Sequence, residues 1–208
     1  MATAIAGPLS RFYAKSTAEA ARMRAGVETW REDLQGSVAK KVGEQLDWDE
    51  SAQVSFTGDL GDSGWQALRL FAFYAERDDL ELPDRVPALL ELDREWRAAA
   101  DQKFVRSKYG HLLACPLWLP GDFPVTMRVP LPNGETDEIG SLNVLADQMR
   151  FLNQRTFQAD AWEIVGWATL AAGPGGPLLE AAKRGFAGLH TAVQFALMHR
   201  LPVVVRPT

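Results

Sequence analysis

The chain has 208 residues, of which 47% are hydrophobic and 24% are charged. This balance is typical of a globular protein and excludes an intrinsically disordered chain, which is poor in apolar residues and rich in charge. The net charge of −5 argues against nucleic-acid binding, because that affinity depends on Lys and Arg side chains that neutralise phosphates.

The N-terminal segment and the cysteine content predict the compartment. Before Pro8 there is neither a basic stretch nor a long apolar run, so we expect no secretory signal. No window reaches the ~18 uninterrupted apolar residues that a membrane helix needs. The single cysteine, Cys115, cannot form an intramolecular disulfide. We therefore expect a cytoplasmic protein that makes no contact with a membrane.

Residues 16–46 are predicted to form the first helix. Ser16 and Glu19 have the spacing of a capping box, which begins a helix. Gly36 favours helix less than alanine does, by roughly 1 kcal/mol, and a bend is expected there. The apolar residues recur at intervals of three and four and make one stripe: Met23, Val27, Trp30, Leu34, Val38, Val42 and Leu46.

A strand, a turn and an apolar helix are predicted next. Residues 53–57 alternate polar and apolar side chains, as a short strand does, and residues 58–62 have the Gly and Asp content of a turn. Residues 63–77 begin with a second capping-box pattern, from Ser63 to Gln66. Because apolar residues lie on every side of this helix, we expect it at the centre of the core.

A further helix is predicted over about 85–106. Asp84 and Pro87 suit the start of a helix. Its inward stripe is expected to consist of Leu89, Leu92, Trp96 and Ala99.

The segment from 111 to 140 changes to short apolar runs with several prolines. Within it, Asn133-Gly134 suits the positive φ angles of a tight turn. We therefore predict a hairpin of two strands, at about 124–131 and 135–140.

The last part of the chain is predicted to be helical and to end in a strand. Ser141 or Asn143 can cap an amphipathic helix, and the apolar run 162–170 is read as helix, with a buried strand as the alternative. The prolines and glycines of 173–177 then break the chain before a helix to about residue 199. Residues 203–206 have the composition of a closing strand.

These elements together predict an α+β fold. It is predominantly helical, with about six helices and a small antiparallel sheet built on the hairpin near 124–140. We expect a single globular domain over residues 1–208, with a boundary near 107–111 as the alternative.

The charge pattern is the most specific feature of the sequence. Residues 42–84 hold eleven acidic side chains against only Arg69 and Arg77, a net charge of −9. Such a surface steers a basic partner at long range. The alternative is that these carboxylates are solvated or serve local caps and turns. The acidic residues are Glu44, Asp47, Asp49, Glu50, Asp59, Asp62, Glu76, Asp78, Asp79, Glu81 and Asp84.

We therefore hypothesise a non-enzymatic protein that presents this acidic region to a basic protein partner, as an immunity, antitoxin or adaptor protein does. Tryptophans at loops often contribute to interfaces, so an exposed Trp48 is favoured, and for Trp118 an exposed and a core role are weighed equally. The expected partner-binding residues are Asp47, Trp48, Asp49, Glu76, Asp78, Asp79, Glu81 and Trp118.

Known chemical motifs are not recognisable. Asp59 and Asp62 lack the ligand spacing of a calcium loop, and the glycines of 173–176 precede no phosphate-loop Lys-Ser/Thr pair, so no metal or cofactor is expected. His111 and Cys115 would lie ~13 Å apart in an extended chain, too far for a nucleophile pair. A buried, apolar Cys115 is expected instead.

Two other functions stay open. The first is a small-molecule, hydrolase-like enzyme whose site lies between 58–62 and 109–123 and draws on Asp59, Asp62, Tyr109 and His111. The second is a structural subunit of a larger assembly, which would expose a large apolar patch.

Overall fold

The computed structural model describes residues 2–14, 16–42 and 46–207, and for Thr17, residues 38–42 and Pro207 it describes the backbone alone. Six strands form one sheet in this part of the chain. In chain order they are β1 (Ala2–Ala6), β2 (Phe56–Gly61), β3 (Leu117–Leu119), β4 (Met127–Pro130), β5 (Thr136–Ser141) and β6 (Val203–Pro207).

The sheet is mixed, with strand order β2-β1-β6-β3-β5-β4. β1 lies antiparallel between β2 and β6. β3 is antiparallel to β6 and parallel to β5, which in turn forms a hairpin with β4. The sheet is therefore larger than the small antiparallel sheet that was predicted, because β1, β2, β3 and β6 join the predicted hairpin. Both sides of the 107–111 segment supply strands to this sheet.

The α+β class is confirmed, with eight α-helices among the described residues instead of about six. α1 and α5 were not expected, and each has only five residues. The helices are α1 (Leu9–Tyr13), α2 (Thr17–Val42), α3 (Gly64–Ala75), α4 (Arg94–Asp101), α5 (Gly110–Ala114), α6 (Leu142–Arg155), α7 (Ala161–Gly166) and α8 (Leu178–His199), with short 3₁₀ turns η1 (Leu90–Leu92) and η2 (Trp167–Thr169).

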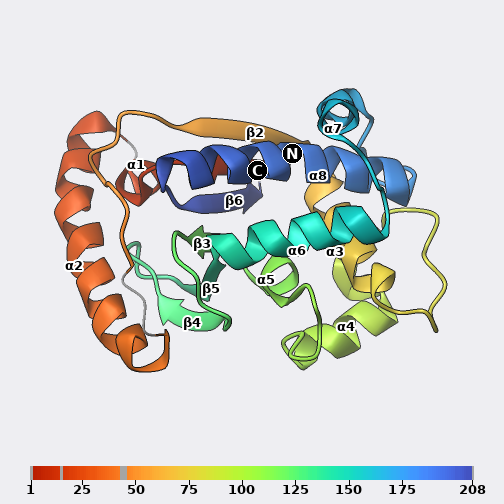
Figure 1. Ribbon diagram of the computed structural model, residues 1–208, viewed down its shortest axis with the longest axis horizontal. Coiled ribbons are helices and arrows are strands. Elements are labelled where there is room, and N and C mark those ends of the chain that lie inside the picture. Colours follow the sequence, from red (N-terminus) through yellow and green to blue (C-terminus); the bar gives the residue numbers. More distant parts are fainter. Residues whose placement is uncertain (1, 15, 43–45, 208) are drawn as a thin grey trace.

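The sheet has a hydrophobic core on each face. Alternation along β6 shows this directly, because Val203 and Val205 pack with α3, α6 and α8, whereas Val204 packs with the α1–α2 side. α2 covers the second, smaller core through Val27 and Leu34. Figure 1 shows α2 at one end of the molecule and α4 at the other.

Several predicted elements are confirmed. The hairpin turns at Gly134, whose φ is +83°, and the Ser141 hydroxyl caps α6 by accepting the Val144 amide at 3.1 Å. At the start of α2, the Glu19 amide donates to the Ser16 hydroxyl at 3.2 Å, and the helix continues through Gly36. The side chains of Val38 and Val42, two members of the predicted stripe, lie outside the described residues.

The helical prediction for 162–170 and the closing strand near 203–206 are also confirmed. α3 is the central helix that its sequence predicted, since nine of its residues are buried. Ser63, however, makes no side-chain cap hydrogen bond at its N-terminus, so the second capping box does not form.

Residues 58–61 form part of β2, so the predicted turn over 58–62 is wrong. The reason is close packing: a Cβ atom on Gly58 would collide with the backbone carbonyl of Gly188 in α8. Glycine at position 58 is therefore required for contact between strand and helix. Of the two glycines in β2, Gly61, with φ of +74°, is the one whose backbone conformation favours glycine.

The predicted helix over 85–106 is shorter than expected and begins at Arg94. Residues 84–86 are instead held to the loop before α8, where the Leu178 amide donates to the Asp84 carbonyl and the Val86 amide to the Gly176 carbonyl. Asp93 caps the helix by accepting the Trp96 amide at 2.8 Å. Of the expected inward stripe, Trp96 is buried, whereas Leu89 and Leu92 are exposed.

α8 approaches α3 and β2 so closely that Gly185 and Gly188 leave no room for a Cβ atom. A Cβ atom on Gly185 would overlap the backbone carbonyl of Gly64, and one on Gly188 would overlap that of Asp59. Neither neighbour is a flexible side chain, so the helix axes would have to separate.

We predict that Gly185→Ala lowers the free energy of unfolding by about 1–3 kcal/mol, because the added methyl overpacks a contact between two backbones. Gly26→Ala is the control, because Gly26 lies in α2 with nothing within 4 Å of an added Cβ. It should raise stability by about 0.5–1 kcal/mol through helix propensity. Urea denaturation of both variants measures the difference, and equal stabilities would contradict the packing account.

Candidate functional site

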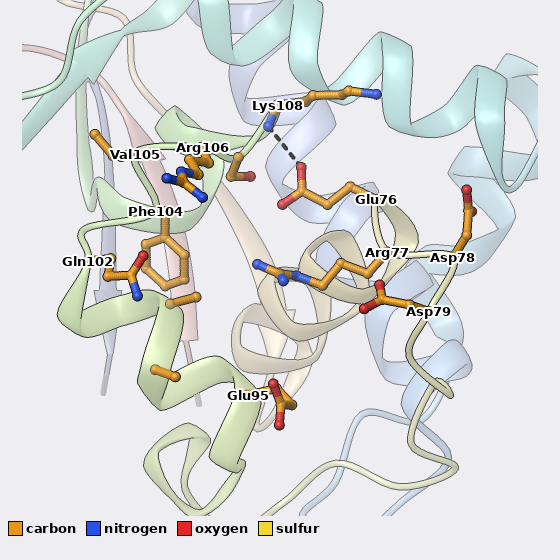
Figure 2. Close-up of a pocket in the computed structure, with 13 residues that line it drawn as sticks. Glu76, Arg77, Asp78, Asp79, Glu95, Gln102, Phe104, Val105, Arg106 and Lys108 are labelled. Carbon is orange, nitrogen blue, oxygen red and sulfur yellow. Dashed lines mark hydrogen bonds between the residues drawn. The ribbon is translucent and has the colours of Figure 1, made fainter.

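A groove of about 590 Å³ lies where the end of α3 meets α4 and the segment 102–108. Figure 2 shows charged side chains entering it from all three elements. Its acidic side consists of Glu76, Asp78, Asp79 and Glu95, and its basic side of Arg77, Arg106 and Lys108. We call this the charged groove.

The end of α3 is tied to the segment 102–108 by Glu76. Its carboxylate accepts the backbone amide of Lys108 at 2.8 Å, the dashed line in Figure 2. α4 is held against α3 by rings, since Trp96 and Phe104 both contact Phe73 edge-on. These contacts give the groove a rigid base.

A hydrogen bond also joins the two helices beside the groove. The Tyr74 hydroxyl donates to the Asp93 carboxylate at 2.8 Å. Burial of the ring, followed by this bond to a carboxylate, raises the pKa of Tyr74 to about 12. Asp93 thus serves both as the cap of α4 and as a link to α3.

The turn that leads out of α4 is strained. Lys103 and Phe104 have φ angles of +54° and +52°, in the left-handed region that costs non-glycine residues roughly 1–2 kcal/mol each. Burial of the Phe104 ring against Trp96, with centroids 4.8 Å apart, offsets this cost. The turn directs residues 105–108 along the rim of the groove.

The charged side chains of the groove are not neutralised by one another. Within the described residues, none of these seven side chains forms an ion pair, even though both signs occur in one hollow. Arg77 lies over the Phe73 ring at 4.2 Å, and its buried Nε has no hydrogen-bond partner. The groove therefore offers unused charges of both signs to a ligand.

Three of the predicted partner-binding residues, Glu76, Asp78 and Asp79, line this groove. Glu81 is exposed nearby in sequence but does not line it. Sequence reasoning missed Glu95, Arg77 and Arg106 as site residues. Arg77 could have been identified from the sequence, because it directly precedes the Asp78-Asp79 pair. Glu95 and Arg106 come to the groove only when the chain folds.

The other predicted site residues lie elsewhere. Asp47 and Asp49 lie between α2 and β2 and do not line the charged groove. Asp47 is 3.9 Å from the Arg31 guanidinium, and Asp49 accepts the Ser51 amide and hydroxyl. These hydrogen bonds from Ser51 lower the pKa of Asp49.

Trp48 and Trp118 are both buried, so the expected exposure of Trp48 is wrong. The Trp48 indole donates to the Glu50 carboxylate, which also accepts the amides of Leu9 and Ser10 at the start of α1. The Trp118 indole donates to the His111 carbonyl at 3.0 Å. Each ring therefore serves a core and not a surface.

The acidic stretch 42–84 does not form one surface. Glu50 is buried as the acceptor for α1, and Asp59 is paired with Arg184 at 2.5 Å. Local structural roles thus account for part of the charge, as the alternative interpretation held. Glu44 lies outside the described residues.

The segments 58–62 and 109–123, between which an enzyme site was hypothesised, contribute strands that are not neighbours in the sheet. Strands β1 and β6 separate β2 from β3, which places these strands ~14 Å apart at ~4.8 Å per strand. His111 is buried, where its Nδ1 accepts the Ser141 amide at 2.9 Å and its Nε2 lies 3.3 Å from the Pro124 carbonyl. The enzyme hypothesis stays a prediction.

His111 and Cys115 do lie in one helical turn, contrary to the extended chain that was assumed. The Cys115 amide donates to the His111 carbonyl, and both side chains border Gly140. Burial raises the pKa of the Cys115 thiol far above its ordinary value. Cys115 is thus the buried, apolar residue that the sequence predicted, and a thiolate is disfavoured.

A second hollow, of about 540 Å³, lies between α6 and α8. His190 lines it over Phe186, and burial lowers its pKa. Two polar groups beside it are already engaged: Arg150 pairs with Asp147 at 2.6 Å, and the Asn153 amide exchanges hydrogen bonds with the Ala159 backbone. This hollow offers a ligand fewer unused charges than the charged groove does.

Exposed apolar side chains occur one turn apart on α7. Trp162 is 85% exposed and Val165 63%. The structural-subunit hypothesis calls for such side chains, although two of them do not make a large patch. That hypothesis stays a prediction.

Comparison with known proteins gives no relative, since no protein family, curated protein or solved structure matches this chain. In the described residues, no group of three or more His, Cys, Asp or Glu side chains could hold a metal ion. No helix of this part of the chain is long and apolar enough to cross a bilayer.

We predict that Lys103→Gly raises the free energy of unfolding by about 0.5–1 kcal/mol, because glycine adopts the left-handed backbone without the steric cost. Asp101→Gly, two residues earlier in the last turn of α4, should lower it by up to about 1 kcal/mol. Thermal and urea unfolding compare the two variants, and a loss of stability in both would mean that the turn is not strained.

The free energy of unfolding should depend on pH through His111. Burial lowers the pKa of folded His111 below the ~6.5 of the unfolded chain, so the unfolded state binds the proton first as the pH falls. Stability contributed by neutral His111 is complete above pH ~7 and declines as the pH falls through ~6.5 toward the folded pKa. Unfolding free energies at pH 7.5, 6.5 and 5.5 should decline less steeply for His111→Gln than for the native chain, and an unchanged slope would refute this.

Proposed function

We propose that this chain is a protein-binding protein, without catalytic activity of its own, that engages a basic segment of a partner protein at the acidic side of the charged groove. The observation that carries the proposal is the set of four carboxylates that line the groove from the end of α3, the following turn and α4, none of them in an ion pair with another described residue. An adaptor, immunity or antitoxin role fits this description.

Electrostatics support this proposal through association rate more than through affinity. Asp78 and Asp79 are exposed, and Figure 2 shows the Asp78 side chain pointing away from the hollow, where an approaching partner meets it. Exposed charges interact weakly at equilibrium but steer encounter over about a Debye length, ~8–10 Å at physiological salt. The net charge of −5 adds to the attraction for a basic partner.

The residues of the groove also favour binding over catalysis. The polar side chains that line it are carboxylates, guanidinium groups, the Lys108 ammonium, the Gln102 amide and the Ser107 hydroxyl, and Ser107 accepts the Tyr109 amide without a hydrogen bond to a neighbouring base. Nucleophilic catalysis requires such an activated group within hydrogen-bond reach of a base. A surface that binds by charge needs none.

Charge reversal tests the proposal. The chain is immobilised, its partner is captured from a lysate of the host cell and identified, and association of the purified partner is then measured at low and at physiological salt. We expect a partner with a basic isoelectric point, and an association rate reduced at least ~10-fold by Asp78→Lys with Asp79→Lys.

The matched control is Glu32→Lys with Asp33→Lys, which makes the same change in net charge on the exposed face of α2, away from the groove. The control should keep most of the association rate. An acidic partner, or equal losses in the two double variants, would show that the acidic side of the groove is not the binding surface.

A further inference from the structure

The basic residues of the charged groove are not explained by a partner that is only cationic. Figure 2 shows the Arg77 side chain extending into the middle of the hollow, with the Glu76 carboxylate on one side and Asp79 and Glu95 on the others. A lysine or arginine entering between these carboxylates would meet the Arg77 guanidinium. Like charges placed side by side in this way weaken binding.

The side-chain N–H groups of Arg77 have no acceptor among the described residues. Its side chain lies over the Phe73 ring at 4.2 Å, makes no hydrogen bond or ion pair with a described residue, and has a buried Nε without a partner. A guanidinium presents five N–H donors in a planar fork that suits the two oxygens of a carboxylate. The ring contact fixes the direction of the side chain, so little rotational freedom would be lost when an anion binds.

Arg106 provides a second guanidinium at the opposite wall. It lies on the segment after Phe104, and it too makes no ion pair within the described residues. The left-handed turn at Lys103 and Phe104, with the Phe104 ring buried against Trp96, holds this wall away from the acidic side. The backbone, and not a pairing of side chains, therefore places Arg106 across the groove from Asp79 and Glu95.

From these contacts we propose that the occupant of the groove is a dipolar segment of the partner, in which a carboxylate side chain lies near a cationic one. The carboxylate binds Arg77 and Arg106, and the cationic side chain faces Asp79 and Glu95. This inference rests on the proposed function, because it specifies the chemistry of the partner segment at the same groove. A free oxyanion such as phosphate would use the basic side alone and leave the four carboxylates unused.

Capped synthetic peptides test the pairing of charges. The dipolar peptides each hold one arginine and one glutamate separated by one, two or three glycines. Two matched sets replace the glutamate by glutamine or the arginine by citrulline. Binding is followed at low ionic strength through the backbone amide resonances of residues 76–79 and 102–108 in the ¹⁵N-labelled full chain, with inorganic phosphate as a separate probe.

We expect one spacing of the dipolar peptide to bind at least ~10-fold more tightly than both of its neutralised forms. Arg106→Gln and Arg77→Gln should each reduce this preference for glutamate over glutamine while the glutamine peptide still binds. Arg97→Gln, on an exposed residue of α4 outside the groove, is the control and should keep the preference. Because Arg106 is exposed, Arg106→Gln should leave the fold intact, and it tests the proposal even if Arg77→Gln unfolds the chain.

The outcomes separate the two proposals. Equal binding of the glutamate and glutamine peptides, with loss of binding in the Asp78 and Asp79 double variant, would overturn the dipolar segment and leave the basic partner standing. Phosphate that shifts the same resonances with equal affinity would overturn it in favour of a free anion. Absence of shifts with every peptide would also overturn it.

Discussion

The close contact of α8 with α3 and β2 determines the arrangement of the larger core. Gly185 meets Gly64, and Gly188 meets β2 beside Gly58, so that backbone lies against backbone with no room for a Cβ atom. Such contacts fix the distance between elements more tightly than side-chain packing does, because backbone atoms have no alternative rotamers. The N-terminus of α3 is consequently fixed against the middle of α8.

The position of the charged groove follows from this constraint. α3 begins at its contact with α8 and ends twelve residues later, where Glu76 binds the Lys108 amide. α4 is then added through rings, with Trp96 and Phe104 against Phe73. Since rigid helices and buried rings form the base of the groove, its charged side chains have fixed origins even though several of them are exposed. A partner that binds at such a base would need to order little backbone.

The sequence predicted elements whose signals are local. The Asn-Gly turn, the Ser141 cap and the wholly apolar α3 each depend on a few neighbouring residues, and all three are present. The elements that were missed depend on residues distant in sequence. β1 and β3 are too short to show a hydrophobic pattern. The glycines of β2 suggested a turn, because the sequence does not show that they pack against α8. The site divides in the same way. Asp78 and Asp79 stood out as a charged run, whereas Arg106 and Glu95 join them only through the strained turn and the cap of α4.

The pairing of β1 with β6 has a consequence for the order of folding. Ala2 lies opposite Pro207, so this pair of strands joins residues that are about 200 positions apart in the sequence. Contacts of such long range are slow to form, because a large loop must close before they bring any stabilisation. Until β6 inserts between β1 and β3, both of these strands present unpaired edges. Newly made chains are therefore most exposed to edge-to-edge aggregation in the interval before residues 203–207 pair, and a chaperone that shields strand edges would act at that stage.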